Sequence, residues 1–455
     1  MPLAEGDVDA SSSASVDTDV VIVGAGLAGL RCAARVAMSG LDVTVLEAAD
    51  AVGGRQRTDE VDGFRLDRGF QVLNPAYPAV RRWVDVDALD LRRFPVGVEV
   101  RRAGQADAAV LAHPLRHPGL LPATLRSGLV APRELIALGR WLAPAILRPR
   151  SIIAGADRSL AEGWDRAGLR GPLRTEVLEP FLAGVLAEDR GDTSDAFARL
   201  LMRMFAIGGP GLPAAGIGAV PAQLADAARS SGAEVRTNAE VVRVRGRGRD
   251  RAATGRARAG VRVELAGGGE LAASAVVIAV GPEAVARLVD VPAPATRGLQ
   301  TWWFAADKAP TTSAMLAVDG RRAGPVVNAV VLSHTVPDAA PPGRHLIAAT
   351  NLLPASARTA PSAAPAEAAV RRHVGEIWAT DASAWRLLRR DDLPDALPAQ
   401  LPPLRTRRPA RLGDGIYVAG DHRDTASIQG ALVSGDRVGR AVVRDLLGAP
   451  AESVP

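Results

Sequence analysis

Close to its start, the chain passes directly from a β-branched apolar run into a glycine-rich turn. Residues 20–23, Val-Val-Ile-Val, suit a buried parallel strand. The turn has the spacing G-x-G-x-x-G, with glycines at Gly24, Gly26 and Gly29. The first glycine allows a tight bend, the second lets the backbone approach a pyrophosphate, and the third packs the helix on the strand. The alanine-rich residues 30–38 then predict a helix whose N-terminus is an anion site.

A second strand and an acidic residue follow where a nucleotide-binding βαβ unit has them. Gly40 ends the helix, and residues 41–46 predict a strand that closes on Glu47. A carboxylate about 20 residues beyond the glycines accepts hydrogen bonds from both ribose hydroxyls and repels a 2′-phosphate. The opening of the chain therefore predicts a dinucleotide site and disfavours NADP.

Length and composition narrow the class of protein. The 455 residues correspond to about two or three packed units. Hydrophobic residues make up 47% and charged residues 23%, which excludes a disordered or disulfide-scaffold protein. A net charge of +5 favours neither a nucleic-acid partner nor a polybasic membrane anchor. The single cysteine, Cys32, forbids an intrachain disulfide and indicates the cytoplasm, and no apolar run reaches the ~18 residues of a spanning helix.

Other segments predict the remaining elements. Residues 1–16 are typical of a flexible tail, and residues 114–205 predict a mostly helical insertion. The Arg/Gly-rich stretch 245–251 predicts a solvated hairpin and not a nucleic-acid patch, because no interleaved aromatic residues supply stacking surfaces. Further predictions are helices over 220–230 and 366–378, extended chain over 235–244, strands over 276–280 and 416–419, a sheet-rich region over 301–351 and a proline-rich connector over 393–409.

The segment after the second strand carries motifs that belong to a known superfamily. It contains E-A-A-D-A-V-G-G-R over 47–55 and G-F-R-L-D-R-G-F-Q over 63–71. These motifs resemble the flavoproteins that include flavin-containing amine oxidases, protoporphyrinogen oxidase and carotenoid (phytoene) desaturases. The resemblance implies an FAD cofactor with Gly53, Gly54 and Arg55 beside its pyrophosphate and ribityl chain. A guanidinium suits phosphate geometry.

The middle of the chain is similar to the same superfamily. Residues 215–218, A-G-I-G, resemble its Gly-Gly-Met segment, with Ile217 as a departure. Val241 falls at the position whose backbone amides pair with adenine in these proteins. The strand over 277–282 matches the one that closes their nucleotide domain.

The end of the chain carries the strongest match, with Y-V-A-G-D over 417–421 and S-I-Q-G-A-L-V-S-G over 427–435. Asp421 can accept a hydrogen bond from a ribityl hydroxyl. Amides at the helix start near Gly430 face the N1/C2=O edge of the isoalloxazine, where negative charge develops on reduction.

The resemblance thus implies non-covalent FAD contacts from Gly24, Gly26, Leu27, Ala28, Gly29, Glu47, Ala48, Gly53, Gly54, Arg55, Gly69, Phe70, Val241, Gly281, Gly420, Asp421 and Ile428.

Two positions separate the chemistries of this superfamily. Its amine oxidases place an aromatic wall beside the flavin, and the alignment puts Ser427 there. They also use a lysine near flavin N5, but the only lysine here, Lys308, follows a strand in a turn-like context. Both departures favour a desaturase- or dehydrogenase-like enzyme that takes hydride from a hydrophobic or cyclic substrate with little acid/base machinery. No catalytic residue is assigned. The alternatives are a flavin amine oxidase and, in another class, a flavin-binding protein with structural FAD.

Several conspicuous residues have simpler interpretations. Cys32 is interpreted as a packing residue and not a flavin tether, because its helix faces the pyrophosphate. His422 is interpreted as a hydrogen-bonded loop histidine. His113 and His117 have no cysteine or acidic partners at metal spacing, so no metal is predicted. Residues 135–147 predict an ordinary core helix in preference to an interfacial helix at a membrane.

The predicted fold is α/β, a Rossmann-like FAD-binding domain with an inserted α+β substrate domain made of a mixed sheet and a helical subdomain. The FAD-binding domain is discontinuous, over 17–95, 206–294 and 405–447, and the substrate domain takes 96–205 and 295–404. The expected partners are a small hydrophobic substrate and an electron acceptor, oxygen or a quinone, with no nucleic acid. The expected location is the cytoplasm, with peripheral membrane contact left open.

Overall fold

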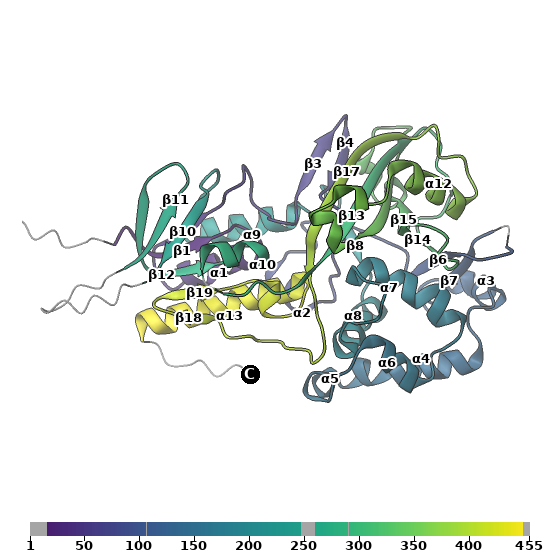
Figure 1. The fold of residues 1–455 in the computed structure, drawn as a ribbon, viewed down its shortest axis with the longest axis horizontal. Helices are drawn as coiled ribbons and strands as arrows, with labels where there is room; N and C mark the ends of the chain where they lie inside the picture. The colour runs from purple at the N-terminus through teal and green to yellow at the C-terminus, as the bar shows by residue number, and fades with distance from the viewer. Residues whose placement is uncertain (1–15, 106, 247–259, 290, 449–455) are drawn as a thin grey trace, which may run out of the picture.

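The structure, a computed structural model, describes residues 16–105, 107–246, 260–289 and 291–448. In Figure 1, one sheet with its helices occupies the left of the molecule, a second sheet the upper right and a group of helices the lower right. The predicted tail over 1–16, except its last residue, lies outside the described residues. So does most of the predicted hairpin over 245–251.

The first sheet contains the predicted nucleotide-binding unit. β1 (Thr18–Val23) lies between β2 (Val43–Leu46) and β12 (Glu270–Ile278) and is parallel to both. The strand order is β10-β11-β12-β1-β2-β9, and β19 (Ile416–Val418) pairs in parallel with β12. The predicted opening unit and last strand are confirmed. The other strands of this sheet are β9 (Glu234–Arg236), β10 (Val241–Arg245), β11 (Val261–Leu265) and β18 (Arg411–Gly413).

Three helices from distant parts of the sequence pack together beside this sheet (Figure 1). α1 (Leu27–Ala37) contacts both α9 (Ala219–Ser230) and α13 (Ile428–Leu447). A Cβ on Gly435 would overlap the Ala28 carbonyl oxygen, so α13 and α1 touch through their backbones. Asp436 accepts from the Arg31 guanidinium at 2.6 Å between the same helices. The first and last helices are therefore one packing unit.

The second sheet has the order β17-β13-β16-β15-β14-β6-β7. Its second strand, β13 (Thr296–Ala306), is antiparallel to β16 (His345–Leu353) and β17 (Arg386–Pro398). Trp302 and Trp303, adjacent on β13, are both buried in separate cores on its two sides. The remaining strands are β6 (Gly97–Arg101), β7 (Ala109–Ala112), β14 (Leu316–Asp319) and β15 (Val326–Val331), and α12 (Glu367–Trp378) packs on β14 and β15.

A group of helices between residues 121 and 207 confirms the predicted helical insertion. Trp141 of α4 is fully buried, and its Nε1 donates to Asp195 Oδ1 at 2.7 Å. This face of residues 135–147 therefore belongs to a core, as predicted. The helices are α3 (Leu121–Arg126), α4 (Pro132–Leu147), α5 (Pro149–Ala154), α6 (Leu160–Ala167), α7 (Glu179–Leu186) and α8 (Asp195–Ile207), with a π-helical turn over Leu173–Leu178. Within the described ranges, no helix is both long and apolar enough to cross a bilayer.

Two sequence predictions are wrong in detail. The proline-rich stretch 393–409 is not a connector throughout, because β17 continues to Pro398 and pairs with β13. An edge strand tolerates the missing N–H of Pro394, since that position need not donate to the sheet. The extended stretch 235–244 is two strands, β9 and β10, separated by a bend in which Asn238 has a φ of 56°.

Short elements outside the two large sheets were not predicted. They are the hairpin β3 (Thr58–Val61) and β4 (Phe64–Asp67), the pair β5 (Leu91–Arg93) and β8 (Gly211–Pro213), and the helices α2 (Pro78–Trp83), α10 (Pro282–Leu288) and α11 (Leu332–Thr335).

Candidate functional site

The glycine turn after β1 is closed on one side and open on the other. Gly24 has a φ of 102°, and a Cβ there would lie 2.8 Å from the Ala279 carbonyl oxygen. A Cβ on Gly29 would overlap the Gly24 carbonyl oxygen, which confirms the close helix-to-strand packing. Over Gly26, by contrast, an added Cβ would meet no described atom within 4 Å apart from its chain neighbours and its own helix. The N-terminus of α1 therefore faces open space that an anion can enter.

The double glycine lies against this turn. The Gly53 N–H donates to the Ala25 carbonyl at 2.9 Å. Gly54, with a φ of 59°, would place a Cβ 3.6 Å from the Gly26 Cα. Two chain segments without side chains thus border the same space, as a cradle for a pyrophosphate requires. Leu27 and Ala28, in the first turn of α1, are buried.

Glu47 sits at the end of β2 with its carboxylate held by backbone. Its Oε2 accepts from the Ala25 N–H at 2.7 Å, and its Oε1 accepts from the Ala49 N–H at 3.0 Å. Each carboxylate oxygen has a second lone pair, so acceptance from ribose hydroxyls stays open. The Ala239 N–H donates to the Glu47 carbonyl at 2.8 Å, which brings Val241, two residues on, to the same edge. Ala48 beside it is exposed.

An ion pair joins the opening segment to the closing one. Arg55 Nη2 lies 2.6 Å from Asp421 Oδ2, and Arg55 Nη1 donates to the Ala396 carbonyl on β17 at 2.7 Å. Asp421 is 4% exposed, and its Oδ1 has no hydrogen-bond partner among the described residues. Buried carboxylate oxygens are rarely left without donors. Asp421 therefore has room for one more donor, such as a ribityl hydroxyl.

His422 has the same property. It is 4% exposed, and neither ring nitrogen has a partner in the part of the chain that the structure describes. Burial lowers the pKa of His422 to about 4, so the imidazole is neutral and offers one donor and one acceptor. The sequence predicted a hydrogen-bonded loop histidine, but no described group forms a hydrogen bond with the His422 ring. Unpartnered polar atoms on adjacent side chains fit an absent polar ligand.

The start of α13 differs in one respect from the sequence-based expectation. The Gly430 N–H donates to Ser427 Oγ at 3.1 Å and is therefore not available to a flavin. Ser427 is the N-cap of the helix. The amides of Ile428 and Gln429 come first in the helix and have no intrahelical acceptor, so they remain suited to a developing negative charge.

Gly69 and Phe70 lie where the opening segment meets the second sheet. The Gly69 N–H donates to Asp391 Oδ2 at 3.1 Å, and the Phe70 N–H donates to Thr301 Oγ1 at 3.3 Å. Asp391 also accepts from Trp303 Nε1 at 2.9 Å. Gly281 lies just before α10, three residues after β12, and Gly420 lies just before Asp421, two residues after β19. The structure therefore gathers the predicted residues at one end of the sheet, with Gly69 and Phe70 turned toward β13 and β17.

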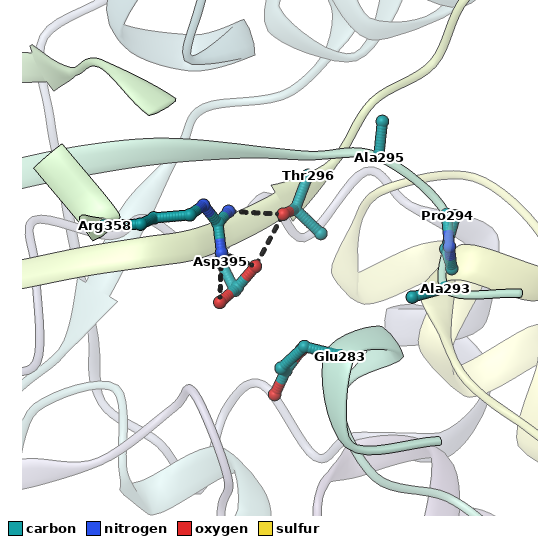
Figure 2. A pocket seen from close by; sticks show the side chains of 7 residues that line it. All are labelled: Glu283, Ala293, Pro294, Ala295, Thr296, Arg358 and Asp395. Carbon is teal, nitrogen blue, oxygen red and sulfur yellow. Dashed lines mark hydrogen bonds and ion pairs between the residues drawn. The ribbon is translucent and has the colours of Figure 1, made fainter. Parts of the chain in front are cut away.

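A cleft of about 320 Å³ lies beside this region, lined by Glu283, Ala293, Pro294, Ala295, Thr296, Arg358 and Asp395. Figure 2 shows Arg358, Thr296 and Asp395 directed toward one another, with Glu283 apart from them. Arg358 pairs with Asp395 at 2.8 Å, and Thr296 Oγ1 donates to Asp395 at 2.5 Å. Asp395 precedes Ala396, and the Ala396 carbonyl accepts a hydrogen bond from Arg55. The cleft therefore adjoins Arg55, one of the predicted cofactor residues.

Sequence reasoning missed Asp391, Asp395 and Glu283. The first two lie on β17, in a region without a recognisable motif that was assigned in part to a connector. Residues 386–393 read R-L-L-R-R-D-D-L, without the period-two alternation that would have predicted a strand.

Other singled-out residues lie away from the site or are structural. Lys308 is exposed. Cys32 is fully buried in α1, and burial raises the pKa of its thiol to about 12. His117 Nε2 accepts from the Val96 N–H at 2.9 Å. No cluster of three or more metal-ligating side chains occurs among the described residues.

Comparison with known proteins agrees with this arrangement. The profile of the family described as "Flavin containing amine oxidoreductase" matches residues 27–443. Putrescine oxidase of Kocuria rosea is 43% identical over 90 residues, which are 20% of this chain and 19% of that protein. Hydroxyneurosporene desaturase of Rhodobacter capsulatus is 49% identical over 57 residues, 12% of either chain. The matched stretches thus span less than a fifth of these relatives.

Solved structures are similar over nearly the whole chain. An oxidoreductase from Methanosarcina mazei has a TM-score of 0.70 at 17% identity, with 93% of this chain and 100% of that one covered. A putative protoporphyrinogen oxidase from Exiguobacterium sp. 255-15 has a TM-score of 0.66 at 18% identity, with 94% and 99% covered. At this identity the likeness concerns the fold, and it confirms the predicted α/β architecture with an inserted domain.

Proposed function

Because the chain belongs to the family of flavin-containing amine oxidoreductases, we propose that it is an FAD-dependent oxidoreductase that removes hydride from a hydrophobic or cyclic organic substrate. The observation that carries the cofactor assignment is the unpartnered Asp421 Oδ1 beside Arg55, at the edge of an open glycine cradle. The proposed domain division is supported by the strands: those of the first sheet all lie within 17–95, 206–294 and 405–447.

We propose that FAD binds without a covalent link. The backbone of Gly26 and Gly54 would border the pyrophosphate, Arg55 would face its charge, and Glu47 would hold the ribose. Asp421 would accept from the ribityl chain. The single cysteine, Cys32, supports this proposal, because it is buried within α1 and its raised pKa keeps it a thiol.

When bound, FAD would supply a two-electron acceptor for a C–H bond. Ser427, at the position of the amine-oxidase aromatic wall, is fixed as a helix cap. Lys308 is exposed and does not lie in a buried site. Both facts favour a desaturase- or dehydrogenase-like reaction that needs no lysine-held water. The reduced flavin would then be reoxidised by oxygen or a quinone, in the reducing cytoplasm that the single cysteine indicates.

A flavin amine oxidase is the second candidate, favoured by the similarity to putrescine oxidase. A flavoprotein with structural FAD is the third. Anaerobic reduction distinguishes them: the purified protein, loaded with FAD, is mixed with polyenes or with amines and its visible absorbance followed. Bleaching by polyenes or other apolar donors supports the proposal. Bleaching by amines alone overturns it in favour of amine oxidation, and bleaching by neither class supports a structural flavin. The Asp421→Ala protein, expected to lose FAD, is the matched blank.

A further inference from the structure

The helical group exposes large aliphatic side chains on its outer surface. Ile136, Leu147 and Ile153 are 62%, 77% and 46% exposed. Along α4 the buried residues Glu134, Ala137, Trp141 and Ala145 form the inner stripe. Pro132, Ile136, Ala143 and Leu147 recur at spacings of four and seven residues on the other side. α4 is therefore apolar on two faces, only one of which the protein covers.

Two further segments meet this helix at its C-terminal end. α5 follows after a single residue and packs against α4. The connector over 399–405 comes next to them, because the Leu404 N–H donates to Asp157 Oδ2 at 2.7 Å, three residues past the end of α5. The Ser194 N–H donates to the Gln400 carbonyl at 2.7 Å. Figure 1 shows this connector descending beside α5. Leu401 on it is 52% exposed.

The charge of these segments has one sign. Residues 113–156 contain six arginines and a single carboxylate, Glu134. Glu134 is 3% exposed and is engaged by the Gly171 and Leu173 N–H groups at 2.7 and 2.8 Å. Residues 399–410, which include this connector, add three arginines and no acid. The surface of these segments thus combines exposed aliphatic side chains with unopposed positive charge.

We propose that this surface, the α4–α5 face, docks the protein on a bilayer that contains anionic phospholipid. The face comprises the exposed residues Arg133, Ile136, Leu147, Arg148, Arg150, Ile153, Leu401 and Arg405. Aliphatic side chains enter the boundary between headgroups and acyl chains, and the arginines pair with the lipid phosphates.

Charge decides against the other occupants of such a face. A second copy of the chain would bring the same arginines into a symmetric interface with no exposed carboxylate from residues 113–156 to oppose them. A nucleic acid would pair with the arginines but would leave the exposed aliphatic side chains in water, and a single strand would also need stacking aromatics. Anionic lipid satisfies both the charge and the aliphatic surface.

Vesicle co-sedimentation of the full FAD-loaded chain tests the proposal. The protein is expected to pellet with vesicles of phosphatidylcholine and phosphatidylglycerol in equal parts, to stay in solution with phosphatidylcholine alone, and to be released by high salt. The double variant Arg148→Glu/Arg150→Glu should lower the partition coefficient by at least about tenfold, since each arginine near an anionic surface contributes roughly fivefold. Ile136→Glu/Leu147→Glu should have an effect of similar size.

The matched controls are Arg229→Glu/Arg243→Glu, at exposed arginines elsewhere, and Met38→Glu, at a 65% exposed methionine. These variants should bind vesicles as the unchanged protein does. Failure of the unchanged protein to pellet with anionic vesicles overturns the proposal. So does a loss of vesicle binding in the control variants that equals the loss in the variants of the α4–α5 face. A dimer in lipid-free solution that Leu147→Glu dissociates would assign the face to a second copy instead. If a glutamate variant fails to fold, Arg148→Gln/Arg150→Gln carries the same test. Vesicle binding does not depend on the redox reaction, so the result of the vesicle experiment is independent of the proposed substrate.

Discussion

Arg55 is the residue at which the first and last segments of the chain meet the second sheet. Replacing it with alanine removes a charge-assisted contact to the proposed pyrophosphate, which contributes about 1.5 to 3 kcal/mol. Arg55→Ala should therefore weaken FAD binding by roughly tenfold to a hundredfold. Flavin fluorescence titration of the apoprotein measures this loss. Arg65→Ala, which removes an exposed guanidinium bonded to the Ala214 carbonyl, is the control and should retain affinity. Full cofactor retention by Arg55→Ala would contradict the assignment.

Two buried groups make the stability of the apoprotein depend on pH in opposite directions. Burial lowers the pKa of His422 from 6.5 to about 4, so the unfolded chain binds a proton that the folded chain refuses. This residue makes the free energy of unfolding fall as the pH falls between these values. Burial raises the pKa of Asp67 from 3.8 to about 6, so the folded chain keeps a proton that the unfolded chain releases. The contribution of Asp67 to the free energy of unfolding is lost as the pH rises from 3.8 to about 6.

The two slopes should largely cancel in the unchanged protein and appear separately in the variants. Asp67→Asn keeps the oxygen that accepts from Thr58 and Ile217, and its unfolding free energy should rise with pH between about 4 and 6. His422→Gln should show the reverse slope. Urea titration of the apoprotein at several pH values measures both. Parallel curves for the two variants would show that neither group is perturbed in this way.

At the scale of single residues, the sequence predicted the glycines well, because G-x-G-x-x-G has steric requirements that the structure meets at Gly24 and Gly29. Sequence reasoning missed the donation from the Gly430 N–H to Ser427 Oγ, although a serine directly before a helix is a common N-cap. Nor did it predict the unpartnered His422, because burial of a loop histidine follows from tertiary packing.

At the scale of elements, α13 depends on glycines at its contact with α1. A methyl group at Gly435 would overlap the Ala28 carbonyl oxygen, and two backbones must separate to admit it. Gly435→Ala should therefore destabilise the fold by about 1 to 3 kcal/mol. Gly139→Ala, in α4 where the described structure leaves the added methyl free, should instead stabilise by about 0.5 to 1 kcal/mol. Urea unfolding followed by far-ultraviolet circular dichroism compares the two. Equal effects would show that the helices do not touch there.

Elements with strong periodicity were predicted closely, as the helix over 220–230 shows, for α9 spans Ala219–Ser230. The error at β17 has a physical origin. Prolines at 394 and 398 are typical of a connector in the sequence. On an edge strand such as β17 they are tolerated, because one side of the strand has no neighbouring strand to pair with. Whether a strand lies at an edge is a property of the whole sheet and is not visible in a local window.

At the scale of the whole molecule, Asp391 joins the second sheet to the opening segment that carries the predicted cofactor residues. It accepts from Gly69 in the opening segment and from Trp303 on β13, and it pairs with Arg389 at 2.9 Å. Asp391→Ala leaves buried donors without acceptors, which costs about 1 to 3 kcal/mol for each group. We expect a lower melting temperature together with weaker FAD binding, measured by calorimetry and titration. Asp392→Ala, at the more exposed neighbour, should change the FAD affinity little. Loss of stability without any change in FAD affinity would show that the sheets do not share the site.

The pairing of β19 with β12 and of α13 with α1 has a consequence for how the protein is made. The nucleotide unit that begins to emerge first from the ribosome lacks a strand, a helix and Asp421 until the last stretch has been synthesised. A nascent chain must therefore keep an unfinished sheet from misassembling until these segments are made, and a stop codon placed before residue 416 should yield a product that proteases clear before it can acquire its cofactor.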